Sequence, residues 1–190
     1  MRIIYILLAL FLFQACNSGN SNETANSSQD PQVNLNDEIY PLPEVSNLIT
    51  PEQIEKALNL HGGAMYETKS NSTDRSKSTF FKLDDPEKGN AAIVIQVKSN
   101  PLPEEFPDWD IGFIQGIKET GEQRIKSEEE PYKYEILDIG IEGVGNRELG
   151  KYLWRDEHRH VYMLAFNVTK TPDEIHDAAL KIAEIVDSNY

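Results

Sequence analysis

The sequence has 190 residues, of which 39% are hydrophobic, and its 18 basic and 32 acidic side chains give a formal charge of −14. This length allows one domain of ordinary size together with a tail. The acidic balance argues against binding to nucleic acid and against broad adhesion to anionic lipid, because both need clustered Lys and Arg. We interpret the charge mainly as a source of solubility.

The first fifteen residues have the layout of a secretory signal. Arg2 provides a positive start, and residues 3–13 form an apolar run without a charge. The run is shorter than the ~20 residues that a helix needs to cross a bilayer. We therefore predict that residues 1–15 are a signal peptide.

The signal ends in Phe-Gln-Ala-Cys, and Cys16 is the only cysteine of the chain. This ending resembles a bacterial lipobox. The resemblance implies cleavage before Cys16, diacylation of its thiol with fatty acids such as palmitate, and anchoring to a membrane of the cell envelope. Asn17 in place of Asp implies the outer membrane, with the domain on its periplasmic or surface face. The alternative, an ordinary signal cut after Ala15, would leave a free cysteine, which is unusual in exported proteins.

The segment that follows Cys16 is rich in Asn, Ser, Gly, Gln, Thr and Pro, and its larger apolar residues are Val33 and Leu35. Such a segment cannot bury enough surface to offset the entropy lost on ordering. We predict a lipidated cysteine and flexible tether over residues 16–36, followed by a single folded domain over residues 37–190.

Three helices are predicted in this domain. Two begin with Thr-Pro followed by Gln or Glu at the third helical position, which is a capping box; their caps are Thr50 and Thr171. A third helix is predicted at 103–119, where Gly112 and Gly116 would permit close approach of another backbone. We interpret the apolar face of this helix as core; it consists of Phe106, Trp109, Phe113, Ile114 and Ile117.

Six strands are predicted from β-branched and alternating residues. They lie at 63–69, 77–83, 91–99, 133–140, 148–156 and 160–168. The last two flank a short connection and predict a hairpin, with Tyr152 and Trp154 on one face of its first arm. Short connections favour antiparallel pairing, so the predicted fold class is α+β, with a mostly antiparallel sheet of about six strands packed with three helices.

The closing half of the chain contains Ile-Glu-Gly-Val-Gly-Asn at residues 141–146, then the predicted hairpin and the terminal helix. This layout resembles small exported lipoproteins of the PsbP-like fold, including the LpqN type. The resemblance implies a sandwich of sheet and helices that serves as a binding or accessory module, without shared catalytic residues. From the residues alone, Gly143 and Gly145 predict a tight turn with positive φ angles.

Histidines are the first candidates for site chemistry. His158 and His160 are two residues apart and therefore share a side of a strand, with Asp156 nearby. Two imidazoles and a carboxylate could bind a transition metal. Neighbouring arginines disfavour a metal, so we interpret this segment as a solvated hairpin turn. We interpret His61 and His176 as surface histidines.

Two acidic clusters are interpreted as solvated charge runs. One lies on the exposed side of the third predicted helix and the other in the loop before Pro131; they consist of Glu104, Glu105, Asp108 and Asp110, and of Glu128, Glu129 and Glu130. Neither has the spacing of a calcium loop, and the sequence has no zinc-protease, phosphate-loop or serine-hydrolase motif. We predict no catalytic, metal or cofactor-binding residues. The candidates for contact with a partner are Glu128, Glu129, Glu130, His158 and His160.

Three classes of function fit these observations. The first is a lipid-anchored envelope protein that presents a non-catalytic, acidic binding or accessory domain. The second is an immunity or inhibitor protein that neutralises a basic toxin or enzyme through steered association. The third is an enzyme whose site has no local motif. The first is favoured because no pairing of nucleophile and base is visible and the single cysteine is assigned to the anchor.

Overall fold

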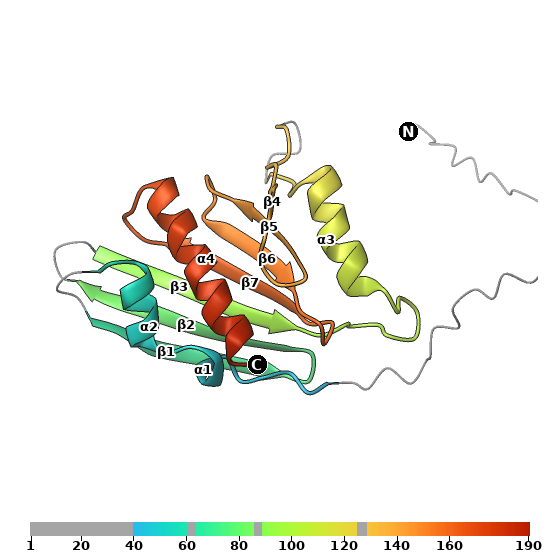
Figure 1. The fold of residues 1–190 in the computed structure, drawn as a ribbon, viewed down its shortest axis with the longest axis horizontal. Helices are drawn as coiled ribbons and strands as arrows, with labels where there is room; N and C mark the ends of the chain where they lie inside the picture. The colour runs from blue at the N-terminus through green and yellow to red at the C-terminus, as the bar shows by residue number, and fades with distance from the viewer. Residues whose placement is uncertain (1–39, 61–63, 86–88, 125–128) are drawn as a thin grey trace, which may run out of the picture. The chain divides into compact units, whose positions relative to one another are not determined.

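A seven-stranded antiparallel sheet forms the centre of the described chain, in the order β1-β2-β3-β7-β6-β5-β4 (Figure 1). The computed structural model describes residues 40–60, 64–85, 89–124 and 129–190. The elements are α1 Val45–Leu48, α2 Pro51–Ala57, β1 Ala64–Thr73, β2 Ser76–Asp85, β3 Gly89–Lys98, α3 Trp109–Thr120, β4 Glu135–Leu137, β5 Glu142–Asn146, β6 Lys151–Arg155, β7 Val161–Asn167 and α4 Pro172–Ser188. This arrangement confirms the predicted α+β class with a mostly antiparallel sheet.

Helices pack on both faces of the sheet. On one face α1, α2 and α4 form the larger hydrophobic cluster, in which Ile54, Trp154 and Ile182 are fully buried. Figure 1 shows α4 lying across the strands with α1 and α2 beside it. On the other face α3 covers a smaller cluster in which Ile114 and Leu153 are buried. The predicted alternation along β6 is confirmed, because Trp154 and its neighbour Leu153 belong to opposite faces.

The capping boxes of α2 and α4 are confirmed. The Thr171 hydroxyl accepts the N–H of Glu174 at 3.3 Å, and the Glu174 carboxylate accepts the N–H of Thr171 at 2.9 Å. Thr50 and Gln53 make the same pair of bonds at 3.3 and 2.9 Å. Each box satisfies N–H groups that the first turn of a helix leaves without partners. The local sequence is therefore sufficient to define the residues at which α2 and α4 begin.

The third helix begins later than the predicted range of 103–119, because α3 starts at Trp109. The segment before it contains three prolines, and a residue that precedes a proline disfavours the helical conformation. The Asn100 side chain shapes this loop by accepting the N–H of Leu102 at 2.8 Å and donating to the Phe106 carbonyl at 2.6 Å. Phe106, which was predicted to belong to the core face, is 56% exposed, so that part of the prediction is wrong.

Glycines in two segments behave differently from the prediction. Gly112 and Gly116 face open space, because a Cβ on either would meet no atom within 4 Å, so the predicted close approach of a backbone is wrong. The predicted glycine turn is instead strand β5, where neither Gly143 nor Gly145 has a positive φ. A Cβ on Gly145 would lie 2.6 Å from the Tyr152 ring. These strand glycines make room for neighbouring side chains.

Candidate functional site

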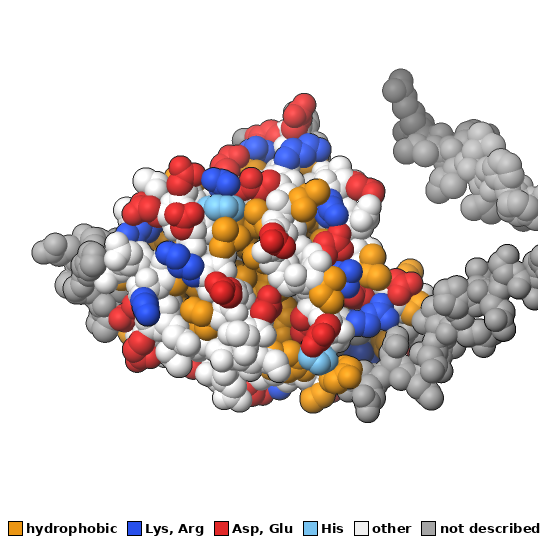
Figure 2. Space-filling model, viewed as in Figure 1, with side chains coloured by type: hydrophobic (Ala, Val, Ile, Leu, Met, Phe, Trp, Pro, Cys, Tyr) orange, Lys and Arg blue, Asp and Glu red, His pale blue; other side chains and the backbone are white. Residues whose placement is uncertain are grey.

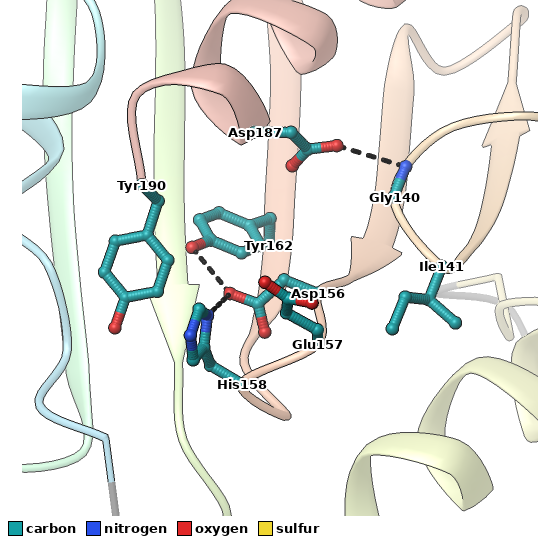
Figure 3. A pocket seen from close by; sticks show the side chains of 8 residues that line it. All are labelled: Gly140, Ile141, Asp156, Glu157, His158, Tyr162, Asp187 and Tyr190. Carbon is teal, nitrogen blue, oxygen red and sulfur yellow. Dashed lines mark hydrogen bonds and ion pairs between the residues drawn. The ribbon is translucent and has the colours of Figure 1, made fainter.

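A pocket of about 230 Å³ opens where three segments that are distant in the sequence meet (Figure 3). The segments are the β4–β5 connection, the end of the β6–β7 hairpin, and the C-terminal end of the chain. The lining residues are Gly140, Ile141, Asp156, Glu157, His158, Tyr162, Asp187 and Tyr190. Three of these are carboxylates and three are aromatic or imidazole rings, so the pocket combines negative charge with ring faces.

The hairpin that supplies Asp156 has a three-residue connection, which was predicted at 157–159. The Asp156 N–H donates to the His160 carbonyl at 3.1 Å, and Arg159 adopts a left-handed φ of 66°. A three-residue hairpin loop commonly has its last residue in this conformation. The Asp156 carboxylate then accepts the His160 N–H at 2.8 Å, which fixes the carboxylate at the base of the pocket.

Asp156 is an ionised carboxylate held by several donors. Besides the His160 N–H, it accepts the Tyr162 hydroxyl at 3.0 Å and faces the Nδ1 of His160 at 3.2 Å. Burial alone would raise its pKa, but the hydrogen bonds and charge of His160 and the bond from Tyr162 together hold the pKa of Asp156 below its usual range. Burial, then the charge of Asp156, raises the pKa of Tyr162, so this hydroxyl stays neutral.

The two histidines of the hairpin do not form a solvated turn, and that prediction is wrong. His160 is 1% exposed, and its Nε2 lies 3.2 Å from the carbonyl oxygen of Tyr40. His158 is partly buried, with its ring 4.3 Å from the Tyr40 ring and 4.7 Å from the Tyr190 ring. The segment before α1 and the C-terminal tyrosine therefore cover the hairpin end, which local sequence did not reveal.

Asp187 forms the opposite side of the pocket. Its carboxylate accepts the indole N–H of Trp154 at 2.8 Å and the N–H of Gly140 at 3.1 Å. Burial, reinforced by the nearby charge of Asp156, raises the pKa of Asp187 despite these two bonds. Gly140 has a φ of 57°, and a Cβ there would lie 2.5 Å from the Arg155 carbonyl oxygen, so glycine is needed at this wall.

The pocket is suited to binding a positively charged group. No Lys or Arg is among its lining residues, and the carboxylates of Asp156, Glu157 and Asp187 face it. The Tyr190 ring also lines it, and aromatic faces attract cations. The Asp156 carboxylate accepts two internal hydrogen bonds and keeps its negative charge beside the pocket.

Other predicted residues lie elsewhere. Glu129 forms an ion pair of 3.7 Å with Arg124, and the Glu130 carbonyl accepts from the same arginine, so neither contributes to the pocket. Cys16, His61 and Glu128 lie outside the described residues. Glu104, Glu105 and Asp108 are exposed, as predicted.

Asp110 and His176 are buried, and their predicted solvation is wrong. Asp110 is 1% exposed and accepts from the Arg159 guanidinium at 2.8 Å, because the first turn of α3 faces the hairpin. His176 is 9% exposed on α4, where its Nε2 lies 3.3 Å from Arg147. Each polar group is buried because an arginine from another element reaches it.

Sequence reasoning did not single out six of the lining residues. Ile141 and Glu157 are chain neighbours of Gly140 and Asp156, and the remaining four are Gly140, Tyr162, Asp187 and Tyr190. Strand alternation could have indicated Tyr162, because it shares a strand face with His160. The other three are brought to the pocket by contacts between distant segments, for which the sequence has no local signal.

Within the described ranges, no three His, Cys, Asp or Glu side chains converge as metal ligands. No helix in the same ranges is long and apolar enough to span a membrane. Comparisons with known protein families, with curated proteins and with solved structures found no match. The pocket and its charges are therefore the basis for assigning a function.

Proposed function

We propose that this chain is a lipid-anchored protein of the bacterial cell envelope, at the outer membrane, that presents a non-catalytic binding domain. The signal-like residues 1–15 and Cys16 support the anchor. The helices on both faces of an antiparallel sheet support the finer proposal of a PsbP-like sandwich. Mass spectrometry of the mature N-terminus tests the anchor: a diacylated Cys16 is expected, and an unmodified Cys16 or an intact Met1 would contradict it.

The acid-lined pocket is the observation on which the binding function rests. Its volume of about 230 Å³ is below the ~300–1,000 Å³ of pockets that enclose drug-sized ligands. It fits the head of one side chain, and its three carboxylates select a cation. We infer that it receives a lysine or arginine side chain of a protein partner, with the ammonium or guanidinium group between the carboxylates and the Tyr190 ring.

The charge of the whole chain supports a basic partner. A net charge of −14 attracts a positively charged protein over a distance and accelerates its association, an effect that salt weakens. Figure 2 shows Asp and Glu side chains spread around an apolar area beside α4, so charge surrounds a surface that a partner could cover. The second candidate, an immunity or inhibitor protein against a basic toxin or enzyme, is favoured by the same pocket.

A pull-down of the lipidated chain from its own envelope, solubilised in detergent, tests this function. A basic protein is expected to bind stoichiometrically at low salt. Glu157→Lys, which reverses a charge at the pocket, should weaken the capture about tenfold, a cost of ~1.4 kcal/mol. Glu148→Lys is the matched control, because Glu148 is exposed at the opposite end of β6.

The outcomes separate the possibilities. Competition by millimolar arginine amide would identify the guanidinium group as the ligand, whereas competition by lysine amide alone would identify an ammonium group. Equal weakening by Glu157→Lys and Glu148→Lys would mean that general charge attraction, and not the pocket, captures the partner. Absence of any stoichiometric partner would overturn the binding function.

A further inference from the structure

The buried His160 ring presents both of its nitrogens to groups that can only accept a hydrogen bond. Nδ1 lies 3.2 Å from a carboxylate oxygen of Asp156, and Nε2 lies 3.2 Å from the carbonyl oxygen of Tyr40. A neutral imidazole has one N–H and cannot donate to both. A neutral ring would turn a nitrogen lone pair toward one of these two oxygens at 3.2 Å, and with the ring 1% exposed no water separates the two atoms.

We propose that His160 is a buried imidazolium and that it forms, with Asp156 and the Tyr40 carbonyl, a proton-dependent latch that holds residues 40–42 against the pocket wall. Asp156 supplies the negative charge that such a cation requires in a buried position. The groups that face His160 are Asp156, just after β6, His158 from the hairpin connection, Tyr190 from the C-terminus and Tyr40. Tyr162 from β7 donates to the same Asp156 oxygen.

Side chains hold residues 40–42 mainly by their carbonyl groups. His160 faces the carbonyl of Tyr40, the Tyr190 hydroxyl donates to that of Pro41 at 3.0 Å, and Lys77 donates to that of Leu42 at 2.8 Å. Among these donors only the imidazole has an ordinary pKa within the range of pH 5–8. Because the Asp156 carboxylate favours a proton on Nδ1, loss of the Nε2 proton would remove one of these three carbonyl attachments and leave the other two in place.

The latch is continuous with the pocket. The Tyr40 ring packs on His158, and Tyr190, which bonds Pro41, packs on the other side of the same imidazole. His158 and Tyr190 both line the pocket. Opening the latch would thus remove the Tyr40 ring from the side of His158, which is part of the pocket wall. This switch does not depend on which ligand the pocket receives, so it goes beyond the proposed binding function.

Nuclear magnetic resonance of the full-length chain in detergent micelles tests the latch. Labelling histidine with ¹⁵N reports the number of ring N–H groups on His160. Labelling tyrosine carbonyls with ¹³C and proline with ¹⁵N isolates the Tyr40 carbonyl, because Tyr40–Pro41 is the one Tyr-Pro step in the sequence. At about pH 6, within the range in which imidazoles commonly titrate, His160 should show two ring N–H signals.

Raising the pH until His160 loses one ring proton should shift the Tyr40 carbonyl signal in the same transition. In His160→Leu, which has no side-chain donor, that signal should remain at the open position at every pH. His176→Leu, which removes a buried histidine outside the latch, should retain the wild-type transition. A single ring N–H on His160 at about pH 6 would overturn the proposal. Proton loss without a change at Tyr40 would overturn it too, and this wild-type titration decides the matter even if His160→Leu does not fold.

Discussion

The end of the β6–β7 hairpin contacts α3 on one side and residues 40–42 on the other. The charged side chains that make these contacts differ between the two sides. On the α3 side, Arg155 and Arg159 reach the buried carboxylate of Asp110, at 3.6 and 2.8 Å. On the α4 side, Asp156 pairs with the ring of His160 at 3.2 Å. The alternation of strand side chains thus continues to the residues at the end of the hairpin, so that neighbouring residues serve opposite faces.

The two sides differ in whether their positively charged groups can lose a proton at physiological pH. Guanidinium groups stay charged at every physiological pH, so the cations that hold α3 do not titrate. An imidazole can lose its charge in that range, so the cation that holds residues 40–42 can be removed. We infer that one side of the hairpin is a permanent attachment and that the other is conditional.

The largest expected effect on stability is on the α3 side of the hairpin end, which is the permanent attachment. Asp110→Asn removes the buried carboxylate that both arginines reach, and leaves Arg155 with Glu142 and Arg159 with the exposed Asp108. We expect the free energy of unfolding to fall by about 3 kcal/mol, measured by urea denaturation. Asp108→Asn is the matched control, because Asp108 bonds the same Arg159 at 3.0 Å while its side chain is 73% exposed. Its loss should be below about 1 kcal/mol, and equal losses would mean that burial does not distinguish the two carboxylates.

Glycines give a second contrast between the two sides. Gly143, in β5, packs so closely that a Cβ would meet the side chain of Ile139 and lie 2.9 Å from its carbonyl oxygen. We expect Gly143→Ala to destabilise the fold by about 2 kcal/mol through overpacking. Gly112→Ala on exposed α3 should instead stabilise by up to about 1 kcal/mol, because alanine favours helices. Thermal unfolding of both variants measures the difference, and destabilisation by both would contradict the packing described for α3.

Much of the fold could be predicted because its signals are local. The caps at Thr50 and Thr171 depend on residues three positions away, and the connection at 157–159 depends on the two runs beside it. Gly143 and Gly145 led to an incorrect prediction of a turn, because glycine occurs both where φ is positive and where packing is close, and sequence alone does not separate the two cases.

The site could be predicted only in part, because distant contacts form it. His158 was a candidate, but its neighbours Tyr40 and Tyr190 lie at the two ends of the described chain. Likewise Asp110 looks like a surface residue of α3 until Arg159 of the hairpin is placed beside it. The burial of such polar residues follows from tertiary partners that periodicity does not reveal.

The conditional side should respond to acid through Asp156. Its pKa is lowered in the folded chain, so it contributes stability above its ordinary pKa of about 3.9 and loses that contribution as the pH falls through the folded value. Asp156→Asn should cost about 1.5 kcal/mol at neutral pH, and the gap to wild type should close in acid. Urea denaturation at several pH values measures the gap, and a gap that does not change with pH would show that the charge of Asp156 is not what stabilises this side.

The smallest effect concerns how the helices on the two faces begin. Thr171 caps α4 with its own hydroxyl, whereas Asp108, at the start of α3, makes no capping bond and directs its carboxylate to Arg159. Thr171→Ala should therefore cost about 1 kcal/mol, and Asp108→Ala less, because no helix N–H loses an acceptor. Thermal unfolding of the two variants compares them. A larger loss of stability in Asp108→Ala would mean that the bond to Arg159 stabilises the start of a helix in this fold more than a local cap does.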